Sequence, residues 1–443
     1  MISRQKHNWR RPTALALVMA LSGLLAGCSP AATELTPHLG VTSAPGATPA
    51  LEARSARPRE IAPQTSGEDL AALAAGNQNF AFDLYQAVRG EDGNLFYSPY
   101  SLSLALAMTY AGARGTTEAE MAETLHFTLP QAQLHPAFNG LDLALTDARD
   151  DAEAFQLSLA NAVWGQQGFD FTPEYLDALA VNYGAGLRLA DFVDPSQRDQ
   201  ARQTINTWVN DETEGRIEDL LPEGILNADT RLVLANAIYF KADWETPFAA
   251  EATMPMPFTL ADGSQLEVPT MSRRASTGYA ASEDVELMEM YYKGGRASMV
   301  ILLPAPGEFE AFEASLDAQR VEALTERLEP GDLQLYLPKF EYAASLDLGA
   351  TLADLGMPSA FDPNAADFSG MDGRRDLYLT SVVHKAFVAV DEKGTEAAAA
   401  TGVVAGATSM PQVVMVDRPF IYLIRDSETG TVLFVGRVVN PAD

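Results

Sequence analysis

The sequence predicts one α+β domain of roughly 375 residues, which starts near residue 67 and runs towards the C-terminus. Helical periodicity dominates the first half of this region, and strand-like patterns dominate the second half. The composition shows no break after residue 67, and strands and helices do not alternate regularly, which argues against a parallel α/β fold. Hydrophobic residues make up 47% of the 443-residue chain and charged residues 20%, as is typical of a globular protein.

The first half of the domain contains most of the expected helices. Residues 69–88 place apolar side chains at helical spacing, and a short strand is expected at 94–97. Pro99 suits the first turn of a helix, and 99–112 is apolar apart from hydroxyl groups, which predicts a buried helix. Further helices are expected from Thr116 onward and at 130–149, 172–183 and 196–213, with a strand at 155–164.

The second half is organised around an apolar run at 232–243, which predicts a central strand buried on both faces. Pro304 ends an expected strand at 299–303. The other expected elements are, in order, short strands and turns within 255–304, a helix at 309–328, a strand at 333–340, a short helix at 346–355, a long strand at 376–390, and strands at 412–416, 420–424 and 432–439.

The segment that follows the long strand carries no charge between Glu396 and residue 411. Its four consecutive alanines favour helix, and a run rich in Gly, Ala, Thr and Ser is often a flexible linker. Side chains of an extended segment alternate between two faces, and the face that runs from Thr395 to Ala407 is uncharged throughout. The segment is therefore either a surface linker or a strand that can enter a sheet without burying a charge.

The N-terminus has the features of an export signal. A basic stretch precedes an apolar run at 14–26, which is too short to span a bilayer and typical of a secretory signal. The sequence Leu25-Ala26-Gly27-Cys28 resembles a bacterial lipobox, whose cysteine is lipidated. We therefore expect a signal peptide at 1–27, a lipid on Cys28 and a location in the cell envelope after export. The alternative is a free thiol in an ordinary signal peptide.

Residues 28–66 are rich in Pro, Ala, Thr, Ser and Gly, which predicts a flexible tether in front of a folded domain at 67–443. The formal net charge of −30 argues against binding to nucleic acid through bulk electrostatics. No apolar run after the N-terminus reaches the roughly 20 residues that span a bilayer. The expected contact with a membrane is therefore the lipid alone.

Several motifs, taken in order, resemble the serpin family over nearly the whole domain. They are Phe96-Tyr97-Ser98-Pro99-Tyr100-Ser101, Thr207-Trp208-Val209-Asn210 with Gly215-Arg216-Ile217, Asn236-Ala237-Ile238-Tyr239-Phe240-Lys241-Ala242-Asp243-Trp244, His384-Lys385-Ala386, Asp391-Glu392-Lys393-Gly394-Thr395-Glu396-Ala397-Ala398, Asp417-Arg418-Pro419-Phe420 and Val435-Gly436-Arg437-Val438-Val439-Asn440-Pro441. The resemblance implies the serpin fold, with three β-sheets, eight or nine helices and an exposed reactive-centre loop.

The same resemblance implies a suicide-substrate inhibitor of serine proteases, with cysteine proteases as a further target class. The target cleaves the loop, stays attached as an acyl-enzyme and is trapped when the cut loop inserts into the large sheet; serpins are a known case of this release of stored strain. The expected partner is a target protease in covalent complex, and the expected inhibitor is a monomer. The alternative is a non-inhibitory serpin that acts as a binding or carrier module.

The resemblance also assigns the reactive-centre loop. Its hinge corresponds to Gly394, Thr395, Glu396, Ala397, Ala398, Ala399 and Ala400. Thr395 is the first inward position, where a charge would have to be buried. Counting fourteen residues from Gly394 places the reactive bond at Thr408–Ser409, and a shift by one or two residues would use Ala407 or Met410. A Thr before the bond favours an elastase-like or subtilisin-like protease over a trypsin-like one.

Two further regions of the family match individual residues. Ser98, Ser101, Asn236 and His384 match the shutter, a polar cluster under the large sheet where its strands part. Trp244 matches the breach, where the loop enters. From the residue types alone, the default interpretation of a buried His among hydroxyl groups is an ordinary core network whose hydrogen bonds are satisfied; the match to the positions of the family favours the shutter.

We expect neither an enzyme nor a cofactor. The sequence has no Gly-x-Ser-x-Gly, His-Glu-x-x-His or Walker motif, and no pattern supports His384 as part of a catalytic triad. Cysteine-based metal sites are excluded because the only cysteine is assigned to the lipid, and no metal ligands are assigned. Heparin-activated serpins use a basic helix surface, whereas Arg149 is the only fixed positive charge of 130–149. We therefore expect no activation by heparin.

Overall fold

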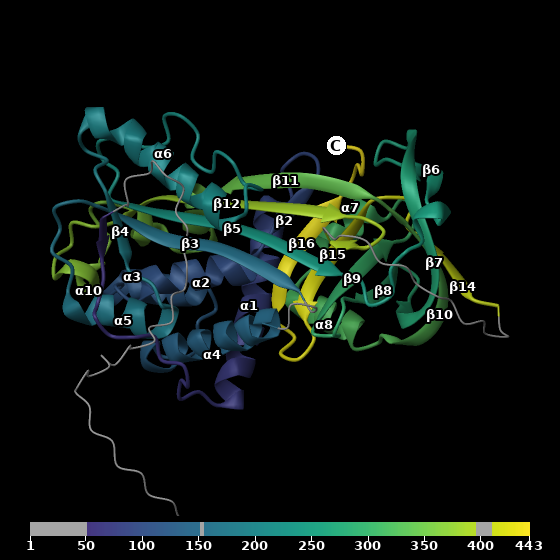
Figure 1. The fold of residues 1–443 in the computed structure, drawn as a ribbon, viewed down its shortest axis with the longest axis horizontal. Coiled ribbons are helices and arrows are strands. Elements are labelled where there is room, and N and C mark those ends of the chain that lie inside the picture. Colours follow the sequence, from purple (N-terminus) through teal and green to yellow (C-terminus); the bar gives the residue numbers. More distant parts are fainter. Residues whose placement is uncertain (1–50, 151–154, 396–409) are drawn as a thin grey trace, which may run out of the picture. The chain divides into compact units, whose positions relative to one another are not determined.

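The computed structural model describes residues 51–150, 155–395 and 410–443, without the side chains of 146–150. These residues form an α+β fold in which two hydrogen-bonded sheets are packed with helices (Figure 1). The ten α-helices of the described residues are α1 (Gly67–Val88), α2 (Pro99–Tyr110), α3 (Gly115–Thr124), α4 (Gln131–Asp150), α5 (Pro173–Tyr183), α6 (Pro195–Glu212), α7 (Phe309–Ala314), α8 (Ala318–Thr325), α9 (Gly349–Leu355) and α10 (Ser369–Asp372). Two 3₁₀ turns cover Ala250–Ala252 and Pro358–Phe361.

The first sheet has seven strands and contains the long central strands of the molecule. In spatial order they are β1 (Leu51–Ala53), β4 (Leu187–Ala190), β3 (Gln156–Gln166), β5 (Leu232–Asp243), β13 (Gly394–Thr395), β12 (Leu379–Val390) and β11 (Phe340–Asp347). Beyond the short β13, strands β5 and β12 pair directly with each other and run parallel. Ten of the twelve residues of β5 are buried, which agrees with the sequence-based prediction of a strand covered on both faces.

The second sheet has nine strands. They are β14 (Gln412–Met415), β10 (Glu329–Pro338), β7 (Gln265–Ala281), β8 (Val285–Tyr291), β9 (Ala297–Pro304), β15 (Phe420–Asp426), β16 (Val432–Val438) and β2 (Leu95–Tyr97) in spatial order, with β6 (Met254–Thr259) paired to β7. The first part of β7 pairs with β6 and its last part with β8. Two of the three expected sheets are therefore joined by hydrogen bonds through this 17-residue strand.

Helices cover both faces of the first sheet. The helix α2 is buried along its whole length, since it packs against β3, β5 and β16. On the opposite face, α6 contributes Ala201, Ile205 and Val209 to a separate apolar cluster that includes alternate residues of β5. Figure 1 shows α2 and α6 on opposite sides of β3 and β5. A strand that entered this sheet would therefore be covered on both faces.

The flexible tether expected at 28–66 is corrected in its last part, because residues 51–65 lie against the folded body. Strand β1 pairs antiparallel with β4, and the backbone N–H of Glu60 donates to the carbonyl of Val181. Arg59 donates to Asn139 Oδ1 (2.8 Å) and to Asp142 Oδ2 (2.7 Å). Ser66 then caps α1 with a capping box. We refer to residues 51–65 as the N-terminal strap; residues 28–50 lie outside the described residues.

Two other expectations differ from the structure. The helix expected at 309–328 is divided into α7 and α8, because Asp317 leaves the helical conformation and caps α8 through the N–H of Arg320. The helix expected at 346–355 begins only at Gly349, since the preceding residues form β11. The strand β11 pairs along its whole length with β12, and it was missed in the sequence.

Candidate functional site

The candidate site is the seam between β5 and β12 in the first sheet. Over most of its length these strands are paired directly, from Leu232 opposite Leu379 to Tyr239 opposite Phe387. At one end β13 lies between them, with Gly394 opposite Asp243 and Thr395 opposite Ala242. Thr395 also pairs with Val390 of β12. The seam is thus closed along one part and already holds two residues of a further strand at its end.

Gly394 stands where only a residue without a side chain fits. A Cβ atom on Gly394 would lie 1.9 Å from the carbonyl oxygen of Ala242, well inside van der Waals contact. The turn before it is held by Asp391, whose Oδ1 accepts from the N–H groups of Lys393 (2.8 Å) and Gly394 (3.3 Å). The close approach to β5 therefore explains glycine at this predicted hinge position.

Thr395 is fully buried although it is the last described residue before the loop. Its Oγ1 lies 2.8 Å from the hydroxyl oxygen of Tyr292, and Tyr292 stacks on Trp244 with ring centroids 4.5 Å apart. Trp244 Nε1 donates to the carbonyl of Asp391 (3.1 Å). The tryptophan predicted to mark the breach therefore contacts the turn that leads into the loop, and the hydroxyl of Tyr292 gives Thr395 a neutral hydrogen-bond partner.

Glu392 fastens the same turn and was not identified from the sequence. Its carboxylate accepts from Lys339 Nζ (2.7 Å) and from Thr253 Oγ1 (2.7 Å). Burial alone would raise the pKa of Glu392, but the hydrogen bonds from Lys339 and Thr253 lower it below its usual value. The carboxylate is therefore charged at neutral pH and ties the turn to two other parts of the fold.

The four predicted shutter residues lie together beneath the middle of the seam. Ser101 N–H donates to Ser98 Oγ (3.0 Å), and Asn236 Nδ2 donates to the Ser101 carbonyl (3.0 Å) and hydroxyl (2.7 Å) oxygens. His384 Nδ1 is hydrogen-bonded to Asn236 Oδ1. Asn161 of β3 completes the cluster, because its Oδ1 accepts from Ser101 Oγ (2.9 Å). Asn161 was missed, although a polar residue between two alanines of an apolar strand was its visible signal.

His384 spans the seam in its neutral form. The backbone N–H of Ser98 donates to Nε2 (3.1 Å), so Nε2 carries no proton and Nδ1–H donates to Asn236. Burial lowers the pKa of His384 to about 3. Because Asn236 is on β5 and His384 on β12, the hydrogen bond between them joins the two strands that would have to separate.

Several predicted site residues lie outside the described residues. These are the hinge residues Glu396, Ala397, Ala398, Ala399 and Ala400, the reactive bond Thr408–Ser409, and Cys28. The side chain of Arg149, on which the heparin expectation rests, is not described either. Within the described ranges, no group of three or more His, Cys, Asp or Glu residues is placed to hold a metal ion. No helix within them is long and apolar enough to cross a bilayer.

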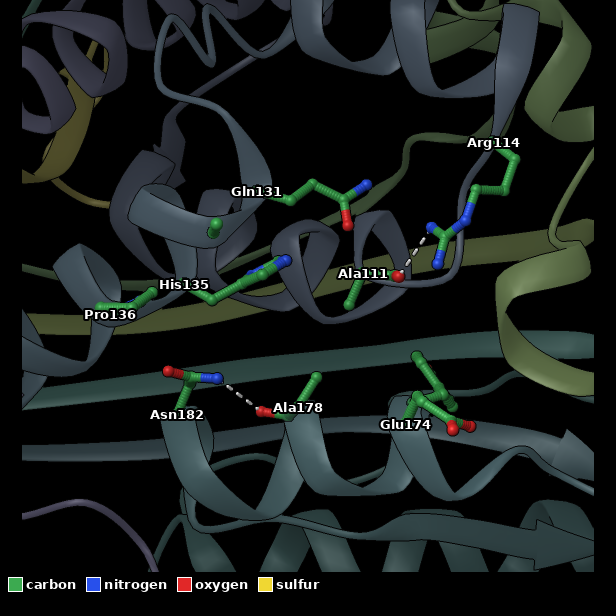
Figure 2. Close-up of a pocket in the computed structure, with 10 residues that line it drawn as sticks. Ala111, Arg114, Gln131, His135, Pro136, Glu174, Ala178 and Asn182 are labelled. Carbon is green, nitrogen blue, oxygen red and sulfur yellow. Dashed lines mark hydrogen bonds between the residues drawn. The ribbon is translucent and has the colours of Figure 1, made fainter.

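A cavity of about 310 Å³ lies away from the seam, between α4, α5 and the end of α2 (Figure 2). Figure 2 shows Gln131 and His135 across the space from Glu174, Ala178 and Asn182. Burial, and secondarily the charge of Arg114, lowers the pKa of His135 to about 4. The imidazole Nδ1 contacts the hydroxyl of Tyr183 (2.6 Å). His135 is therefore neutral and already hydrogen-bonded to Tyr183, and we assign it no catalytic role in this cavity.

Comparison with known proteins gives a consistent result. Residues 75–441 match the family model described as serpin (serine protease inhibitor). The chain is 39% identical over 382 residues to leukocyte elastase inhibitor A of Mus musculus, covering 83% of this chain and 99% of that protein. Two solved structures are also similar, and both are matched over nearly their full length.

The first of these structures is human thyroxine-binding globulin complexed with its hormone, which has a TM-score of 0.76 and 32% identity and covers 84% of this chain and 99% of its own. The second is the thermophilic serpin tengpin in its native state, with a TM-score of 0.77 and 28% identity, covering 87% of this chain and 97% of its own. The family model alone spans more than half of the sequence. The chain therefore belongs to the serpin family.

Proposed function

We propose that this serpin is a suicide-substrate inhibitor of serine proteases, with cysteine proteases as a further target class. A protease cleaves the loop at Thr408–Ser409 and is trapped as an acyl-enzyme while the cut loop inserts between β5 and β12. The observation that carries the proposal is β13, since Gly394 and Thr395 already pair with both strands at the end of the seam. The names of relatives such as leukocyte elastase inhibitor A support protease inhibition at the level of the family.

The register of β13 indicates how the remaining loop would fit. Continuing the antiparallel pairing of Thr395 with Ala242 and Val390 places Thr401 opposite both Asn236 and His384. Thr401 has the same parity as Thr395, whose side chain lies on the buried face of the sheet that includes α2. A hydroxyl would therefore arrive at the shutter when the strands separate, and it can replace a hydrogen bond lost between Asn236 and His384.

The same register also places the remaining side chains of the segment on faces that suit their polarity. Ala397, Ala399 and Val403 would join the apolar face, and Glu396 would point to the opposite face, beside Lys241 of β5. Insertion would replace one parallel pairing by two antiparallel ladders and would bury apolar surface at the same time. Both changes favour the inserted state and support loop insertion as the source of trapping energy.

The proposed target class follows from Thr408. A Thr at the cut suits a small or medium apolar specificity pocket, as in elastase-like or subtilisin-like proteases, whereas a trypsin-like pocket requires Arg or Lys. Incubation with elastase-, subtilisin- and chymotrypsin-like proteases, followed by a denaturing gel, tests this. We expect a covalent band at the summed mass. If only cleaved serpin appears and the protease stays active at every molar ratio of serpin to protease, the protein is instead a non-inhibitory serpin that acts as a binding or carrier module.

A pair of variants at Thr395 tests whether insertion is the trapping step. In Thr395→Arg a guanidinium would have to be buried in the place of Thr395 beside the Tyr292 hydroxyl, so the loop should be cut without trapping and the stoichiometry of inhibition should rise several-fold. Thr395→Ser keeps the hydroxyl and should inhibit like the wild type. Equal trapping by both variants would show that trapping does not depend on an uncharged side chain at this position.

A substitution at the proposed cut tests its position. Thr408→Arg should shift inhibition towards trypsin-like proteases, because the residue before the bond enters their acidic specificity pocket. Mass spectrometry of the released C-terminal peptide locates the bond directly. A peptide that begins at residue 408 or 411 would place the bond at Ala407 or Met410, respectively.

We also propose that a lipid on Cys28 holds the exported protein in the cell envelope. The proposal rests on the sequence Leu25-Ala26-Gly27-Cys28, and it makes the membrane a second partner through the lipid alone. Metabolic labelling with a fatty-acid analogue in the native host should label the wild type and not Cys28→Ser. Equal labelling of both proteins would overturn the anchor without affecting the inhibitory mechanism.

A further inference from the structure

An apolar patch lies on the second sheet next to the point where the reactive-centre loop ends. It consists of Met254 and Met256 on β6, Tyr336 on β10, and Val413 and Met415 on β14. The exposed fractions of Met254, Val413 and Met415 are 50%, 52% and 38%. We call these five residues the methionine patch. Large apolar side chains exposed together on one surface mark a site of interaction more often than single ones do.

The strand register places these side chains on one face. Met415 is opposite Tyr336, and Tyr336 is opposite Ser272 on β7. Met254 is opposite Thr270, two residues before Ser272. Met256, Tyr336 and Met415 also line one shallow hollow together with Thr270. The patch residues therefore lie on three strands, β6, β10 and β14, and β7 runs between β6 and β10 with Thr270 and Ser272 on the same face.

The patch lies close to the bond that the proposed function assigns to the protease. Met415 follows Ser409 by six positions, and an extended chain covers at most about 20 Å over that length. A protease domain of about 240 residues has a radius of gyration of roughly 18 Å. A protease bound at Thr408–Ser409 would therefore extend over β14, which directly continues the loop beyond the cut.

We propose that the methionine patch is a second docking surface for the target protease. The patch would contact the apolar rim of the protease's active-site cleft, on the side of the cleft that binds the residues after the cut. This inference rests on the proposed function and names a surface that selects among proteases with similar specificity pockets. The unbranched, polarisable side chain of methionine adapts to irregular apolar surfaces.

The composition around the patch fits a transient interface. The ion pair of Arg274 with Asp332 (2.6 Å) lies on neighbouring positions of β7 and β10, and Asp417 follows β14. An apolar centre with a charged rim is the usual anatomy of a protein interface. In addition, β14 ends the strand order of this sheet, since it pairs only with β10 among the described strands, and the proposed partner would face its outer side.

The test uses the full-length chain with the double substitution Met254→Gln and Met415→Gln, which removes apolar character and preserves side-chain length. The probes are elastase and subtilisin whose catalytic serine has been replaced by alanine, so that only the non-covalent complex forms. We expect the dissociation constant to rise about tenfold for a protease that uses the patch, as for interface residues that contribute to binding. The matched control is Ile61→Gln, whose side chain is 82% exposed on the N-terminal strap and whose affinity should remain unchanged.

The outcomes separate this inference from the proposed function. Unchanged affinity of the double variant for both inactive proteases would overturn the docking surface, whether or not the wild type traps active protease. A wild type that sedimentation shows to be a dimer, with a monomeric double variant, would assign the patch to a contact between copies of this chain and would also overturn the proposal. Weaker binding without any covalent band would retain the surface and reject suicide inhibition.

Discussion

At the scale of single residues, His384 makes hydrogen bonds that only its neutral form allows. Its Nε2 accepts from the N–H of Ser98 (3.1 Å), so a proton there would place two donors face to face. Burial lowers the pKa of His384 to about 3, whereas an unfolded histidine titrates near 6.5. Below about pH 6.5 the unfolded chain therefore binds a proton that the folded chain does not, and folding stability falls as the pH decreases.

At pH 7 we expect wild type to have a higher free energy of unfolding than His384→Gln. This difference should become smaller by about 2 kcal/mol when the pH is lowered from 7 to 5. Urea unfolding of both proteins at the two pH values measures this difference. The comparison cancels the titration of His135 and of the carboxylates, which the two proteins share. A difference that stays constant with pH would show that His384 titrates normally in the folded protein.

The residue scale also shows what the sequence can and cannot predict about the site. The resemblance predicted Ser98, Ser101, Asn236 and His384 as shutter residues, and the structure places their polar groups close together. The physical reason for Gly394 emerged only from the 1.9 Å approach to the Ala242 carbonyl, because no local pattern reports a neighbouring strand. Glu392 was missed for the same reason, since Thr253 and Lys339 lie far away in the chain, whereas the local signal of Asn161 was overlooked.

At the scale of elements, the N-terminal strap is held by side-chain contacts rather than by a core of its own. The half-buried Arg59 joins it to α4 through Asn139 and Asp142, whereas Arg57 forms an exposed ion pair with Asp177 (3.4 Å). Removing a charged hydrogen-bond partner from a largely covered site costs about 1–3 kcal/mol. An exposed pair contributes about 0–1 kcal/mol.

We therefore expect Arg59→Ala to reduce the free energy of unfolding by about 1–3 kcal/mol and Arg57→Ala to leave it nearly unchanged. Urea unfolding of both variants at pH 7 provides the measurement, and limited proteolysis shows whether the strap is released. Similar losses in the two variants would mean that the strap is held mainly by β1 and backbone contacts.

Elements with a clear period were predicted well, and elements defined by their surroundings were not. The apolar run of β5 and the periodic pattern of α1 lie close to their predicted positions. The strap has no period and only two large apolar residues, Leu51 and Ile61, both exposed, so its composition indicated a tether. Strand β11 was missed because only its pairing with β12 distinguishes it from the start of the following helix.

At the scale of the whole molecule, the fold class could be predicted because helices and strands are segregated along the chain. The number of sheets could not be predicted, because the long strand β7 joins two of the three expected sheets by pairing with β6 at one end and with β8 at the other. Such continuity depends on how far one strand bends, which no local pattern encodes. The direct pairing of β5 with β12 was equally invisible, and it has the largest consequence for the behaviour of the molecule.

Cleavage of the loop should make this serpin more stable, which is the reverse of what a cut does to most proteins. Separating β5 from β12 and filling the seam would add two antiparallel ladders and bury the apolar face from Ala397 to Ala407. We expect calorimetry to show a melting temperature at least about 10 °C higher after cleavage, which corresponds to roughly 8 kcal/mol for a domain of this size. The cleaved Thr395→Arg variant should melt well below the cleaved wild type, since its first inward side chain resists burial. Identical melting of intact and cleaved wild type would show that the seam does not accept the loop, and the trapping mechanism would then lose its source of energy.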